Sequence, residues 1–110
     1  MQYIEQLSNE NLNSFLACNT PYLNLIENPM QIREEIALLQ GEGWRTTISE
    51  RDGDRETEFL FGMHKDGIGA VFAHSTSAER AMCEAIAKAI CKPYELAIYQ
   101  SEALCLSGVC

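Results

Sequence analysis

The sequence has few chain-breaking residues and little positive charge. Only three prolines and seven glycines occur in 110 residues, which excludes collagen-like and low-complexity disordered chains. Lysine and arginine total eight against sixteen acidic residues, giving a formal charge of −8. A surface without a basic stripe repels the phosphate backbone, so we expect no direct binding of nucleic acid.

Long apolar runs and disulfide patterns are also missing. No run approaches the ~18 apolar residues of a membrane-spanning helix, and Met1-Gln2-Tyr3-Ile4-Glu5 lacks the features of a signal peptide. The five cysteines are an odd number without a framework spacing: Cys18, Cys83, Cys91, Cys105 and Cys110. We therefore expect a cytoplasmic protein with free thiols and no membrane contact.

What is present suits one small folded domain. Apolar residues make up 46% of the chain, enough for a single core, so we expect one α+β domain over 1–110 with a frayed tail from about 107. Ser8 can cap a helix over 9–18, and Asn28 followed by Pro29 can start a second helix. Gly41 and Gly43 can end that second helix.

Three short β segments follow, at 44–50, 56–63 and 68–74. Asp52-Gly53 and Asp66-Gly67 separate them, and Asp-Gly is a strong hairpin signal. Two-residue turns at both places would put Ile48 opposite Thr57 and Phe61 opposite Phe72. The expected core face then holds Trp44, Ile48, Phe59, Phe61, Met63 and Phe72, with His74 at its end, and the outer face holds an apolar patch of Leu60, Val71 and Ala73.

A third helix follows the sheet. Thr76 and Glu79 form a capping box, and an alanine-rich apolar stripe runs to Ile90. Pro93 is expected to end or kink this helix. Residues 94–106 then favour a further helix, with an extended segment through Leu96–Tyr99 as the alternative. The expected architecture is a three-stranded antiparallel meander with helices before and after it packed on the sheet.

No motif carries chemistry at a diagnostic spacing. His64 and His74 have no partner at a zinc-ligand spacing, and Cys83 lies on a core-lining helix, where a thiol acts as a small apolar group. Exposed carboxylates such as Glu56 and Glu58 lack the burial that tunes a general acid. We therefore expect no enzymatic activity, no metal and no cofactor.

The least explained feature is an acidic cluster around the first hairpin turn. Arg51 and Arg55 interrupt it, and its members are Glu50, Asp52, Asp54, Glu56 and Glu58. One interpretation is a solvated hairpin whose charges discourage edge-to-edge pairing. The other is a contact surface for a basic partner.

Order and spacing from Asn28 to Ile90 resemble the phage ABA sandwich domain family. The resemblance rests on a helix beginning Pro29-Met30-Gln31-Ile32, on Gly43-Trp44 opening a strand, and on the alanine-rich helix after Thr76. The first 27 residues and the tail after Pro93 depart from the pattern. The resemblance implies a phage or prophage accessory protein in the cytoplasm of a bacterial host, and it offers no active site to carry over.

Two functional hypotheses follow. In the first, the protein binds a host protein or complex that has a basic surface, as an inhibitor of host defence such as an anti-CRISPR protein would. In the second, it is a homodimeric or larger structural or regulatory module that associates through the apolar patch of Leu60, Val71 and Ala73.

Overall fold

The computed structural model describes the backbone of residues 4–53 and 55–106 and the side chains of that range up to residue 92. The elements, in chain order, are η1 (Ile4–Gln6), α1 (Asn9–Asn19), η2 (Leu25–Glu27), α2 (Pro29–Gly41), β1 (Arg45–Asp52), β2 (Thr57–Lys65), β3 (Gly69–Ser75) and α3 (Ala78–Leu106). The described helices include none that is both long and apolar enough to cross a membrane. The expected tail after 107 lies outside the described residues.

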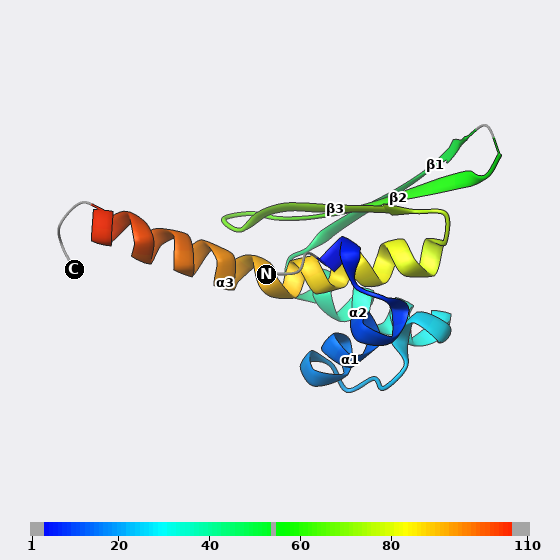
Figure 1. The fold of residues 1–110 in the computed structure, drawn as a ribbon, viewed down its shortest axis with the longest axis horizontal. Helices are drawn as coiled ribbons and strands as arrows, with labels where there is room; N and C mark the ends of the chain where they lie inside the picture. The colour runs from blue at the N-terminus through cyan, green and yellow to red at the C-terminus, as the bar shows by residue number, and fades with distance from the viewer. Residues whose placement is uncertain (1–3, 54, 107–110) are drawn as a thin grey trace.

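The three strands form one antiparallel sheet in the order β1-β2-β3, which confirms the predicted meander and the α+β class. Helix α3 packs against β3 and β2. Figure 1 shows α1 and α2 beyond α3, so the sheet, α3 and the N-terminal helices form successive layers. The described helices leave the opposite face of the sheet open.

The first half of α3 lies at the centre of the core, between the sheet and the N-terminal helices. Its hydroxyl cap is Ser77, one residue after the expected Thr76: the Ser77 Oγ accepts from the Arg80 N–H at 3.2 Å. Ala81, Cys83, Ala85, Ile86 and Ala87 are all fully buried. They point in every direction around the helix, because α3 has packing partners on both sides.

Pro93 does not end this helix, so of the two expected outcomes, an end or a kink, the end is wrong. Helix α3 runs without interruption to Leu106, and its second half extends beyond the sheet (Figure 1). A proline removes one backbone donor but still permits helical φ, so a helix can continue through it. The prediction of helix over 94–106 is correct, as part of the same element.

The two N-terminal helices begin where the sequence predicts. Ser8 caps α1, its Oγ accepting from the Asn11 N–H at 3.1 Å. Asn28 occupies the cap position of α2, but its side chain makes no capping bond and donates to the Asn24 carbonyl oxygen at 2.6 Å. Leu12, Leu16 and Ile32 of these helices are fully buried.

The first hairpin has a longer loop than predicted but the predicted faces. Asp52 is opposite Thr57 and Ile48 is opposite Phe61, so the turn is a loop of residues 53–56. The expected partner of Ile48 is Thr57, so the partner strand is shifted by four residues from the predicted register. A shift by an even number leaves every side chain on its predicted face, because strand side chains alternate.

The second hairpin slips by one residue, which reverses the predicted faces of β3. Lys65 is opposite Gly69, and the extra turn residue is accommodated by Gly67 and Gly69, with φ of +82° and +119°. Phe61 is therefore opposite Ala73, and Gly62 is opposite Phe72. An odd shift exchanges the two faces of a strand.

The predicted positions of four β3 side chains are consequently wrong. Val71 and Ala73 are buried against α3, whereas Phe72 and His74 are exposed on the open face. The remaining buried set agrees with the sequence analysis, because Trp44, Phe61 and Met63 are each 5% exposed or less. Phe59 is half-buried, and Ile48 is exposed although it lies on the core side.

Candidate protein-binding hairpin

The β1–β2 hairpin projects past the end of β3 and past α3 (Figure 1). Its loop is closed by the Gly53 N–H, which donates to the Glu56 carbonyl oxygen at 2.9 Å. The Thr57 hydroxyl lies 3.4 Å from the Asp52 carboxylate across the base of the loop. The tip therefore stands clear of the packed layers while keeping an ordered strand pairing.

The structure brings the predicted acidic residues together on this hairpin but divides them between two faces. Glu50 and Asp52 share the α3 side with Ile48, and Glu58 lies on the open face opposite Arg51. Glu56 is in the loop, and Asp54 lies outside the described residues. The four described carboxylates are all exposed, so each can meet a partner.

Strand β1 is an edge strand that the helices barely cover. Gln40 donates to the Thr46 hydroxyl at 2.9 Å, but from Thr47 to Asp52 every residue is exposed. Ile48 is 57% exposed even though its cross-strand partner Phe61 is buried. Helix α3 packs against β3 and β2 but does not extend over β1. The alternation of side chains in the sequence could not reveal this.

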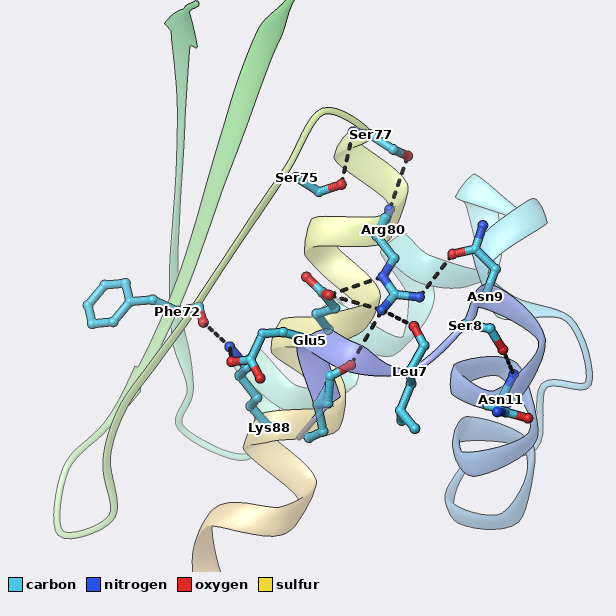
Figure 2. Close-up of polar contacts among 12 residues, drawn as sticks. Glu5, Leu7, Ser8, Asn9, Asn11, Phe72, Ser75, Ser77, Arg80 and Lys88 are labelled. Carbon is cyan, nitrogen blue, oxygen red and sulfur yellow. Dashed lines mark hydrogen bonds and ion pairs between the residues drawn. The ribbon is translucent and has the colours of Figure 1, made fainter. Parts of the chain in front are cut away.

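The open face of the sheet carries an apolar patch different from the predicted one. It contains Leu60, 44% exposed, and Phe72, 58% exposed. The Phe72 ring lies over Gly62, where a Cβ would meet its Cε1 at 2.9 Å, as glycine and a cross-strand aromatic often pair in sheets. Figure 2 shows this ring on the side of β3 away from α3.

A hollow of about 360 Å³ lies on the same face. Arg51, Glu58, Leu60 and His74 line it, together with Ser49 and Phe59. His74 and the Glu58 carboxylate thus share one site, but both are exposed. Solvent therefore reaches both side chains in the hollow.

The Cys83 thiol belongs to the core. Cys83 is fully buried, and this burial raises the pKa of its thiol to about 12, so it is protonated and inert at neutral pH. Cys18 is exposed on α1. Within the described residues no three His, Cys, Asp or Glu side chains gather closely enough to hold a metal ion.

The other edge of the sheet is tied down by α3. Figure 2 shows Lys88 between β3 and η1, where its Nζ donates to the Phe72 carbonyl oxygen at 2.7 Å and pairs with the Glu5 carboxylate. The hydrogen bond between Lys88 and the Glu5 carboxylate lowers the pKa of that carboxyl below its ordinary value. Covering a sheet edge with neighbouring segments is a common device against unwanted pairing.

Arg80 fixes the N-terminal segment to α3. Its guanidinium bonds the Glu84 carboxylate at 3.1 Å, the Leu7 carbonyl oxygen at 2.6 Å and the Asn9 side chain at 2.9 Å (Figure 2). The Arg80 and Glu84 side chains are 12% and 6% exposed. The pair is thus structural, and its charges are not available to a partner.

Comparison with protein-family models, with curated proteins and with solved structures finds no match to this chain. The candidate site therefore depends on the geometry of the hairpin alone.

Proposed function

We propose that this protein is non-enzymatic and acts by binding a protein or protein complex that has a basic surface, through the projecting β1–β2 hairpin. One observation carries the proposal: the exposed carboxylates of Glu50, Asp52, Glu56 and Glu58 belong to a hairpin that extends clear of the helices. A net charge of −8 steers the same encounter.

The resemblance of residues 28–90 to the phage ABA sandwich domain family supports a narrower form of the proposal. In that form the chain is a phage or prophage accessory protein in the bacterial cytoplasm, and its partner is a host protein. A nucleic-acid channel of a defence complex, such as a CRISPR effector, has the required basic chemistry. The protein would then compete with nucleic acid for that channel.

Charge reversal on the hairpin tests the proposal. The triple variant Glu50→Lys, Asp52→Lys and Glu58→Lys should lose salt-sensitive capture of host proteins from lysate, because opposite charge drives the encounter. Unchanged capture at both low and moderate salt would contradict the hairpin as the contact surface.

A matched control separates the hairpin from net charge. The variant Glu10→Lys, Glu27→Lys and Glu42→Lys makes the same charge change at exposed positions outside the hairpin. It should keep the captured proteins that the hairpin variant loses. Equal loss in both triple variants would show that the capture responds to total charge alone.

A second candidate function is self-association through the open face, because Leu60 and Phe72 are both exposed there, in diagonal positions on β2 and β3. Light scattering over a range of concentrations decides this alternative. A dimer that Leu60→Asp or Phe72→Asp converts to monomer would favour it, and a monomer at every concentration would remove it.

A further inference from the structure

The two edges of the sheet differ in their contacts with the rest of the protein. At the β3 edge the Phe72 carbonyl oxygen is bonded by Lys88, and η1 lies beside it, since Ile4 and Glu5 line one groove with Val71 and Lys88. At the β1 edge the exposed stretch runs from Thr47 to Asp52. An exposed, regular edge strand presents unpaired N–H and C=O groups to another strand.

From this asymmetry we propose that β1 binds an extended segment of a partner protein by strand addition, which deepens the proposed function and rests on it. The side chains of β1 define which segment fits. Ile48, Glu50 and Asp52 point to the α3 side, and Arg45 and Arg51 point to the open side. Each face of the strand thus carries charge of one sign.

This separation of charges disfavours a second copy of β1 as the occupant. Two copies paired antiparallel about a two-fold axis place residues of the same face opposite each other. No such register places Arg45 or Arg51 directly opposite Glu50 or Asp52, so the pairing gains no opposite-charge pair. Some registers place like charges opposite each other, as when Arg45 meets Arg51 or Glu50 meets Glu50. Like charges directly opposite are destabilising.

The segment that fits has the reverse pattern. It carries lysine or arginine on the α3 side, opposite Glu50 and Asp52, with an apolar residue opposite Ile48, and it carries carboxylates on the open side. Main-chain hydrogen bonds supply affinity in this mode, and the alternating side chains supply specificity. The Ile48 side chain, 57% exposed, gains a cover that α3 does not give it.

Two peptides of identical composition test the pattern on the full chain. The matching peptide, Lys-Glu-Lys-Thr-Val-Thr-Thr-Glu, pairs antiparallel with β1 from Asp52 to Arg45. The control, Glu-Lys-Glu-Thr-Val-Thr-Thr-Lys, exchanges the charges between faces. Both peptides have no net side-chain charge, so the total charge of the protein does not distinguish them. We expect the matching peptide to bind about tenfold more tightly, with amide shifts concentrated in β1 in an NMR titration.

Backbone and charge variants sharpen the result. In an antiparallel pairing, every second amide N–H of the peptide points to β1 and the others point away. N-methylation of the amides that point to β1 should abolish binding of the matching peptide. N-methylation of the amides that point away should preserve it. Glu50→Lys with Asp52→Lys should remove the preference between the peptides. Glu27→Lys with Glu42→Lys, an equal charge change elsewhere, should retain the preference.

Equal binding of the two peptides, binding of neither, or shifts centred on β3 would overturn the inference. A β1–β1 dimer detected by light scattering and NMR would also overturn it, since the occupant would then be a second copy. A protein that keeps hairpin-dependent capture of basic host proteins but does not distinguish the peptides refutes strand addition and leaves the proposed function standing. Equal loss of host-protein capture in the hairpin triple variant and in its control triple variant refutes the proposed function separately.

Discussion

The Nζ of Lys88 lies 2.7 Å from the carbonyl oxygen of Phe72 and also pairs with Glu5. One side chain of α3 thus joins the edge of β3 to the N-terminal segment. The β3 edge thus has a side-chain partner at Phe72, whereas the β1 residues from Thr47 to Asp52 are all exposed.

This contact predicts a pH-dependent contribution to stability. The pKa of Glu5 is lowered in the folded state, first by its hydrogen bond with Lys88. Its stabilisation is therefore present above the unfolded pKa and is lost as pH falls through the folded pKa. Glu5→Gln should lower the melting temperature at pH 7, and the difference from the native protein should vanish in acid. The Glu5 side chain is 54% exposed, so the effect is no more than about 1 kcal/mol. An effect that persists unchanged at low pH would contradict this assignment.

Removing the Arg80 side chain should destabilise the fold strongly. Arg80→Met leaves the Glu84 carboxylate buried without its cation and removes the bonds to Leu7 and Asn9. The expected loss is about 3–5 kcal/mol of unfolding free energy in chemical denaturation. The double variant Arg80→Met with Glu84→Met should recover part of it, because the unpaired charge is gone. A single-variant loss below about 1 kcal/mol would show that the pair is unimportant.

Glu35 offers a stabilising substitution. This residue of α2 is 9% exposed, and burial, with a smaller contribution from Glu42, raises the pKa of its carboxyl. A raised pKa means that the folded state favours the protonated form, so ionisation costs stability as pH rises. Glu35→Gln should therefore raise the melting temperature at pH 7 and have little effect in acid. Glu34→Gln on the exposed side of the same helix is the control.

The second-hairpin register can be tested through Gly62 and Phe72. A Cβ at position 62 would lie 2.9 Å from the Phe72 ring and 3.0 Å from the Thr47 hydroxyl. Gly62→Ala should cost about 1 kcal/mol in the native background, because the ring must shift. With Phe72→Ala present the cost should fall, giving a coupling of about 0.5–1 kcal/mol in a double-mutant cycle. Strictly additive effects would argue that the two side chains do not meet across the strands.

Local sequence signals determined the elements of this fold. Ser8 and Pro29 mark the helix starts, and the two Asp-Gly pairs mark the hairpins. Alternation in β1 and β2 set their faces, because an even change in loop length leaves side-chain direction unchanged. The acidic residues of the hairpin were also identifiable from their clustering in the sequence.

Tertiary structure decided what is exposed. A one-residue difference in the second turn moved Phe72 and His74 to the open face and buried Val71 and Ala73, and the type of turn is not encoded by Asp-Gly alone. The reach of α3 decided that Ile48 would be uncovered although it lies on the core side. Periodicity specifies the direction of a side chain, but only packing between distant segments specifies whether anything covers it.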